Sequence, residues 1–243
     1  MTEYKGVAYL RNKLTAKQLR VNRRYTFYEM KDRKLEQGVT IPPQLRRQYM
    51  STLGWCAKAV DSIADRLVFR EFENDNFQIM DIYRMNNPDV LFDSAILSAL
   101  ISSCSFIYIS PDEEGFPRLQ VIDGGNATGV IDPITGLLQE GYAVLKRDDK
   151  GQPLLQAHFT AEETIYHQAG TGVIRRDVNP APYPLLVPII YRPDARRPFG
   201  HARISRACMY LQTFAKRTLE RSDIAAEFYS IPQRYVLGMS PDA

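Results

Sequence analysis

Short strand-like stretches separated by turn signals fill the middle of this sequence, and no other feature constrains its fold as much. Residues 106–109 combine aromatic and β-branched side chains, which favour strands. Turn signals rich in Asp, Gly, Pro and Asn follow at short intervals, as in antiparallel hairpins. They lie at residues 112–115, 123–126, 132–136 and 148–151. The sequence therefore predicts a mainly antiparallel β-rich region.

A proline-rich connector follows this region. Four prolines between residues 180 and 188 interrupt any regular element there. Residues 187–191 still have strand character, and Pro188 among them cannot donate a ladder hydrogen bond. We therefore expect this segment to be an edge strand.

Helical patterns precede the β-rich region. The apolar residues Leu14, Val21, Tyr25 and Tyr28 recur with the spacing of an amphipathic helix. After a break at Gly38, the prolines at residues 42–43 predict the start of a second helix that runs to Leu67. Residues 87–89 (Asn-Pro-Asp) are typical of a helix start and predict a third helix that ends near Ser103.

A long helix is predicted from about His201 to about Phe228, and strand character resumes at residues 233–238. The whole pattern predicts an α+β fold: N-terminal helices, a mainly antiparallel β-rich region with a packed helix, and a long C-terminal helix. We expect a helical segment at residues 1–70 and an α/β region at residues 71–243. The chain ends without a capping element, which indicates a fragment of a longer protein.

Composition restricts the function classes. The chain has 243 residues, 44% hydrophobic and 24% charged, with a net charge of only +3. The balance is uneven: +8 in residues 1–50, −8 in residues 51–150 and +3 in residues 151–243. The longest apolar run, at residues 90–101, is too short to cross a bilayer, so no membrane partner is predicted. Cys56, Cys104 and Cys208 have no metal-site spacing and are expected to be buried thiols.

Enzyme motifs are not found in the sequence. It contains no phosphate loop, nucleophile elbow or helical pair of metal-ligating histidines. The acidic clusters at residues 112–114 and 148–149 could hold Mg²⁺, but each lies beside a glycine in a predicted turn, where carboxylates usually face solvent. We therefore predict no catalytic residue, no cofactor and no metal site.

The long C-terminal helix carries the most informative pattern. At about 100° per residue, one face is apolar and is expected to be buried, and two flanks are charged. The apolar face holds Ile204, Cys208, Leu211, Ala215 and Leu219. The basic flank holds Arg203, Arg206, Arg217 and Arg221, and the opposite flank holds Lys216, Glu220, Asp223 and Glu227.

Three interpretations of these flanks stay open. A basic flank and an acidic flank can pair edge to edge with copies of the same chain, and such head-to-tail contacts can close into a ring. The arginines can instead contact phosphates, since residues 192–221 hold eight basic and two acidic groups. The third interpretation is a solvated helix with ordinary pairs such as Lys216 and Glu220.

Several segments together resemble portal proteins of tailed bacteriophages, particularly phages with long non-contractile tails. The resemblance rests on residues 198–206 (PFGHARISR), residues 226–238 (AEFYSIPQRYVLG) and residues 54–67 (GWCAKAVDSIADRL), with the turn at residues 131–133 and the connector at residues 187–188 in the same order. It covers roughly residues 20–240. Each motif is modest alone, and the specificity lies in their order and spacing.

The resemblance implies a structural virion protein without enzymatic activity. It implies a ring, usually a homododecamer, at one capsid vertex through which DNA is packaged and ejected. The implied partners are other copies of the chain, the terminase large subunit, head-tail connector proteins, the major capsid or scaffold protein, and double-stranded DNA bound non-specifically. The implied location is the virion, with the host cytoplasm during assembly. Residues 71–243 would correspond to the wing-like region, with stem, clip and crown after residue 243.

Two other functions stay open at this stage. One is a different phage head or connector protein that acts as an adaptor. The other is a metal-dependent DNA-packaging nuclease that uses Asp112, Glu113 and Glu114.

Overall fold

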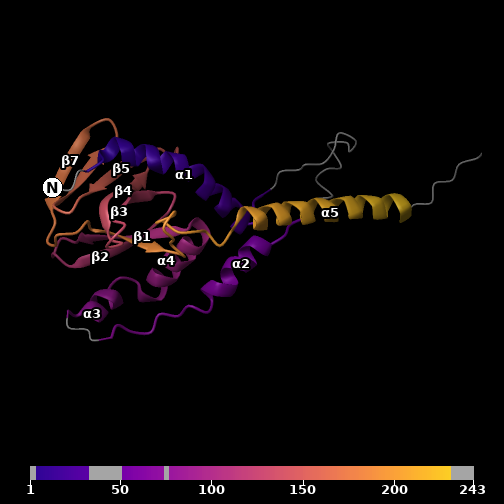
Figure 1. Ribbon diagram of the computed structural model, residues 1–243, viewed down its shortest axis with the longest axis horizontal. Helices are drawn as coiled ribbons and strands as arrows, with labels where there is room; N and C mark the ends of the chain where they lie inside the picture. Colours follow the sequence, from indigo (N-terminus) through magenta and orange to yellow (C-terminus); the bar gives the residue numbers. More distant parts are fainter. Residues whose placement is uncertain (1–3, 33–50, 74–76, 231–243) are drawn as a thin grey trace, which may run out of the picture.

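The computed structural model describes residues 4–32, 51–73 and 77–230 (Figure 1). The helices in this part are α1 (Gly6–Tyr28), α2 (Trp55–Ala64), α3 (Ile79–Arg84), α4 (Pro88–Ser102) and α5 (Arg206–Ser230). The strands are β1 (Cys104–Pro111), β2 (Pro117–Asp123), β3 (Ala127–Ile131), β4 (Leu138–Arg147), β5 (Pro153–Phe159), β6 (Glu163–Gln168), β7 (Gly172–Val178) and β8 (Leu186–Ile190). The fold is therefore α+β, as the sequence predicts.

The strands form two antiparallel sheets between layers of helices. One sheet has the order β2-β1-β8 and the other the order β3-β4-β5-β6-β7. Helix α1 lies over the five-stranded sheet, and α4 packs on the three-stranded sheet (Figure 1). Helix α5 projects away from this body along the longest axis of the molecule.

The main core fills the space between the two sheets. Phe106 of β1, Phe159 of β5 and Leu186 of β8 are at most 1% exposed and belong to one apolar cluster. Burial of large apolar side chains of this kind is the dominant favourable contribution to folding. A second cluster joins the ends of α1, α2 and α4 to the start of α5, through residues that include Phe27, Val60 and Ile204.

Helix α1 is fixed to the five-stranded sheet at its first turn. The Glu140 carboxylate on β4, which is 1% exposed, accepts hydrogen bonds from the backbone N–H groups of Lys5 and Gly6, both at 2.8 Å. The same carboxylate lies 2.7 Å from His158 Nε2 on β5. A negative charge at a helix N-terminus offsets the unpaired N–H groups and the positive end of the helix dipole. The position of α1 is thereby set by the sheet.

The turn signals are confirmed at three places and misinterpreted at one. Residues 112–115, 132–136 and 148–151 join paired neighbouring strands. The turn at residues 123–126 instead leads from β2 in one sheet to β3 in the other. A Cβ atom at Gly124 would lie 2.4 Å from the Cys104 carbonyl oxygen, so this glycine permits the close passage of chain between the sheets. The edge position of β8, with Pro188, is confirmed.

The predicted first and third helices are confirmed by α1 and α4, but the second is shorter than expected. Helix α2 covers only Trp55–Ala64, so Leu67 lies beyond it, and residues 51–54 are not helical. The Cys56 N–H donates to the Gln212 side chain of α5 at 2.8 Å, where a longer helix would use its own carbonyl. The predicted break at Gly38, the prolines at residues 42–43 and the strand at residues 233–238 lie outside the described residues.

Helix α5 begins later than expected and buries a different face. Cys208 N–H donates to Ser205 Oγ at 3.1 Å, so Ser205 caps a helix that begins at Arg206 instead of His201. The prediction of a buried apolar stripe is wrong: Leu211 is 55% exposed and Leu219 is 45% exposed. Of the predicted stripe, Ile204 precedes the helix and is buried, while Cys208 and Ala215 are half-buried.

After Met209, the face that α5 buries is polar. Gln212, Lys216 and Glu220 are at most 8% exposed. Each has a partner on a neighbouring segment: Gln212 the Cys56 N–H, Lys216 the Asp32 carbonyl, and Glu220 the Ser51 N–H. The apolar stripe therefore stays outside because these hydrogen bonds fix the rotation of the helix.

Candidate functional site

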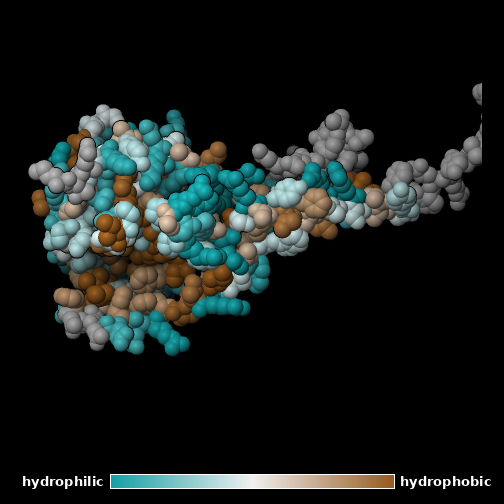
Figure 2. All heavy atoms as spheres, viewed as in Figure 1, coloured by the Kyte–Doolittle hydropathy of each residue, from teal (hydrophilic) through white to brown (hydrophobic). Residues whose placement is uncertain are grey.

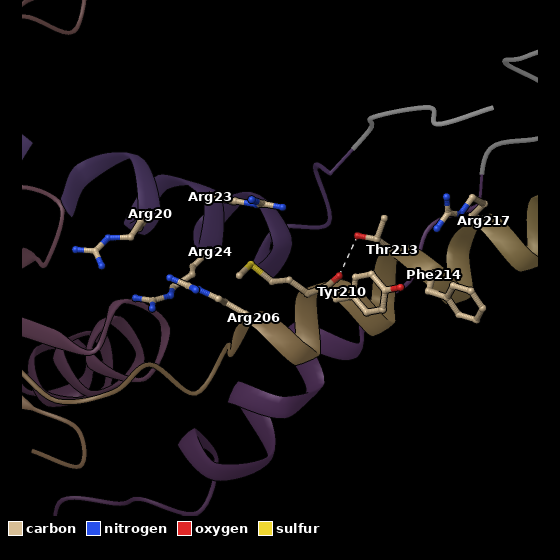
Figure 3. A pocket seen from close by; sticks show the side chains of 9 residues that line it. Arg20, Arg23, Arg24, Arg206, Tyr210, Thr213, Phe214 and Arg217 are labelled. Carbon is tan, nitrogen blue, oxygen red and sulfur yellow. Dashed lines mark hydrogen bonds between the residues drawn. The ribbon is translucent and has the colours of Figure 1, made fainter. Parts of the chain in front are cut away.

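An arginine-lined cleft lies between α1 and α5, where the long helix leaves the body (Figure 3). Its volume is about 560 Å³. The residues that line it come from these two helices alone: Arg20, Arg23, Arg24, Arg206, Met209, Tyr210, Thr213, Phe214 and Arg217. Five of the nine are arginines and none is acidic. The positive charge of the cleft is therefore not neutralised within its own lining.

Helix geometry brings the arginines together. On α1, Arg23 and Arg24 lie three and four residues after Arg20, so both are neighbours of Arg20 on the helix surface. Arg206 lies in the first turn of α5. The two helices are held by the apolar cluster that contains Phe27 of α1 and Met209 of α5. The cleft is thus built on two rigid elements.

Like charges are concentrated at this point. Among the described residues, none of Arg20, Arg23, Arg24 and Arg206 forms an ion pair with a carboxylate. Arg24 Nη1 donates to the Ser102 carbonyl at 3.1 Å. Burial, and then the charges of Arg20, Arg197 and Arg206, lower the pKa of Arg24 below its usual value. An anion in the cleft would reverse this repulsion.

Two aromatic side chains complete the lining. Tyr210 and Phe214 are one turn apart on α5, with ring centroids 6.5 Å apart and an angle of 18° between the ring planes. Tyr210 is 65% exposed and Phe214 is 52% exposed. The Arg217 guanidinium carbon lies 6.0 Å from the centroid of the Phe214 ring. The cleft therefore offers flat apolar surfaces next to guanidinium groups.

A second hollow of about 800 Å³ adjoins the first and shares Arg23, Thr213 and Arg217 with it. Its lining also includes the acidic residues Asp32 and Glu220. The second hollow therefore mixes basic and acidic residues, whereas every charged residue that lines the first cleft is basic.

Comparison with known proteins finds similarity to portal proteins of two phages. No protein-family model matches the chain. The portal protein of Mycobacterium phage L5 is 24% identical over 234 residues, which are 89% of this chain. The portal protein of Mycobacterium phage D29 is 24% identical over 236 residues, again 89% of the chain. The chain is a distant homologue of mycobacteriophage portal proteins. It spans about half the length of these relatives, 48% in each case.

The basic flank predicted for this portal homologue is divided in the structure. Arg206 and Arg217 line the cleft. Arg203 precedes α5, and its Nε donates to the Ala59 carbonyl of α2 at 3.1 Å. Arg221 is exposed and lies outside the lining. The role of these four residues in subunit or phosphate contacts stays a prediction.

Sequence reasoning missed the larger part of the cleft. Arg20, Arg23 and Arg24 supply three of its five arginines, and none of them was predicted as a site residue. Their spacing within a predicted helix was a usable signal, because it places three positive charges on one face. The contact of that face with the start of α5 depends on tertiary packing and has no local signature.

The opposite flank is also divided. Lys216 and Glu220 are buried and bonded inside the chain: Lys216 Nζ donates to the Asp32 carbonyl at 2.6 Å, and Glu220 Oε1 accepts from Ser51 N–H at 3.4 Å. Asp223 and Glu227 are exposed on the part of α5 that projects from the body. Only these last two present carboxylates at the surface of the described helix.

The carboxylates of the two acidic clusters form hydrogen bonds within their own turns. Asp112 Oδ1 accepts from the N–H groups of Glu114 and Phe116, and Oδ2 lies 2.8 Å from Arg118 Nη2. The Phe116 hydrogen bond is the main reason why the pKa of Asp112 is lowered. Asp148 Oδ1 accepts from the N–H groups of Lys150 and Gln152. Within the described ranges, no group of three or more His, Cys, Asp or Glu residues is arranged to hold a metal ion.

In residues 4–32, 51–73 and 77–230, no helix combines the length and the apolar character that crossing a membrane would require.

Proposed function

We propose that this chain is part of a bacteriophage portal subunit, one of several copies that form a ring at a capsid vertex and let DNA pass. The observation that carries the proposal is the similarity of 89% of the chain to portal proteins of two mycobacteriophages. The proposed partners are other copies of the chain, usually in a dodecamer, the terminase large subunit, head-tail connector proteins, the major capsid or scaffold protein, and double-stranded DNA. Its proposed location is the virion, and the host cytoplasm during assembly.

Within such a subunit we assign a structural, non-enzymatic role to the chain. Residues 1–70 would form a helical segment and residues 71–243 a wing-like α/β region. A conduit needs rigid subunits and surfaces that bind their neighbours, and it needs no reacting groups. The two-sheet core and the anchored start of α1 are compatible with a rigid subunit.

The exposed stripe of α5 supports contacts with other copies. Figure 2 shows apolar residues along α5 where it projects from the body, and Leu211 and Leu219 are about half exposed. Apolar side chains on a projecting helix gain free energy when another surface covers them. In a ring, a neighbouring subunit would supply that surface.

The test is the oligomeric state of the protein expressed from its complete gene. Negative-stain electron microscopy and native mass spectrometry should show closed rings with a central channel. The double variant Leu211→Asp, Leu219→Asp should shift the population toward monomers, because each change puts a charge into the proposed interface. Ile134→Asp is the matched control, since Ile134 is 93% exposed in a turn of the body. A monodisperse monomer of the unmodified protein would contradict the ring.

A further inference from the structure

We propose that the arginine-lined cleft between α1 and α5 binds a single-stranded nucleic-acid segment. Arg20, Arg24 and Arg206 would bind its phosphates, and Tyr210 and Phe214 would stack on its bases. This goes beyond the passage of duplex DNA through a ring. It does not depend on ring formation, because every residue concerned lies in one chain.

The cleft concentrates positive charge. Five guanidinium groups surround about 560 Å³, no carboxylate lines the cleft, and four of the five arginines have no carboxylate partner among the described residues. Such an arrangement repels itself, so it is stable only at some cost unless an anion is present. Guanidinium groups bind phosphate through two parallel N–H donors, which a lysine cannot match. All the basic residues of the lining are arginines.

The cleft also contains an aromatic pair. The exposed rings of Tyr210 and Phe214 lie nearly parallel on the same cleft, at an angle of 18°. Inorganic phosphate or a purely acidic ligand would leave these rings in water. Unpaired bases would cover them, because every base has a flat π face that stacks on aromatic side chains. Arginines beside exposed aromatic rings are the combination that single-stranded nucleic acid requires.

The cleft also has a suitable size. A volume of about 560 Å³ is typical of a small-molecule pocket. It can admit a short stretch of one strand, with its phosphate and base, between the two helices. Bases in a duplex are already stacked on each other and cannot reach Tyr210 and Phe214. A duplex could therefore touch the arginines at the rim only, so we expect the single strand to bind more tightly.

The binding test uses fluorescence anisotropy with a labelled ten-nucleotide oligothymidylate and the complete protein. We expect binding that weakens with salt, with a slope of about 0.7 in log K against log salt for each phosphate contact. The double variant Arg20→Ala, Arg206→Ala should reduce that slope by about 1.4 if both arginines contact phosphates. Arg66→Ala and Arg70→Ala are the matched controls, since both arginines are exposed and outside the cleft, and they should leave the slope unchanged.

A second pair of variants tests the stacking. Tyr210→Ala and Phe214→Ala should each weaken oligothymidylate binding by about fivefold or more. They should change the binding of a duplex of the same length much less. Circular dichroism should show an unchanged helix content, because both rings are more than half exposed and support no core.

Competition experiments with unlabelled ligands identify the kind of molecule that the cleft binds. Unlabelled oligothymidylate should displace the probe well, and free thymidine monophosphate and polyglutamate should displace it poorly. The proposal is overturned if the unmodified protein does not bind the oligonucleotide, if the duplex binds as tightly, or if the control variants lose as much. It is also overturned if polyglutamate competes equally and the aromatic variants have no effect, since the cleft would then bind an acidic protein segment. Ring assembly is measured separately, so either proposal can fail alone.

Discussion

The body of this protein and its long helix α5 differ in which side chains they bury. In the body, apolar residues such as Phe106 and Phe159 are fully buried between two sheets. On α5, the polar residues Gln212, Lys216 and Glu220 are buried, while Leu211 and Leu219 face outward. The difference teaches that the pattern of the body serves its own core, whereas the apolar stripe of α5 is not covered by the described residues, which is where we propose that another copy binds.

The largest effect is expected at the buried carboxylate that holds α1. Glu140→Ala removes the acceptor of the two N–H groups at the start of α1 and leaves the buried His158 without this partner. We expect the free energy of unfolding, measured by urea titration, to fall by about 3–5 kcal/mol. Glu163→Ala is the control: its ion pair with Arg176 is partly exposed and should contribute at most about 1 kcal/mol. Equal losses in the two variants would show that α1 is not anchored in this way.

The next effect compares a leucine from each region. Leu186→Ala in the core, where Leu186 is 1% exposed, should cost about 2–5 kcal/mol of unfolding free energy. Leu219→Ala on α5, where Leu219 is 45% exposed, should change it by no more than about 0.5 kcal/mol in the monomer. The same urea titration measures both. A large loss for Leu219 would mean that the outer face of α5 is covered within the chain.

A smaller effect is expected for the polar face of α5. Gln212→Ala leaves the buried Cys56 N–H without its acceptor, which should cost about 1–3 kcal/mol. Gln152→Ala is a suitable control because Gln152 is exposed in a turn and uses only its backbone groups, its N–H and its carbonyl, in the hydrogen bonds of that turn. If Gln212→Ala is neutral, the rotation of α5 is fixed by something other than this hydrogen bond.

The smallest effect concerns the sulfur atoms that join α2 to α5. Cys56 Sγ and Cys208 Sγ are 3.3 Å apart, and both thiols are free. Mild oxidation with diamide should link them and reduce the number of titratable thiols from three to one, leaving Cys104. Burial raises the pKa of the Cys56 thiol, so little thiolate is present at neutral pH and the reaction should become faster as pH rises. Cys208→Ser should prevent the link, and persistence of three thiols would contradict the docking of α5 on α2.

The sequence predicted the body well because its signals are local. Alternating aromatic and β-branched residues mark β1, and the turn residues at 112–115, 132–136 and 148–151 mark three hairpins. The turn at residues 123–126 has the same local composition, but it crosses between sheets, because residues 102 and 104 lie against Gly124. That contact involves residues distant in sequence, and turn composition carries no information about it.

The candidate site was less predictable for the same reason. Arg206 and Arg217 belong to the predicted flank, but the other arginines of the cleft are contributed by α1, almost two hundred residues earlier. Helical periodicity also predicted that the apolar face of α5 is buried, because an amphipathic helix usually packs its apolar face on the core of its own chain. The rotation of α5 is instead fixed by hydrogen bonds with Asp32, Ser51 and Cys56. Each of these residues lies in a segment with no regular pattern of its own or at a helix end.

The carboxylate that anchors α1 also sets an order of events during synthesis. Lys5 and Gly6 leave the ribosome before their partner Glu140, which follows 135 and 134 residues later, and His158 comes later still. The first helix must therefore wait, undocked, while most of the body is translated. Its apolar side, with Leu10 and Leu14, cannot pack on Tyr142 and Val144 until these residues have also been made.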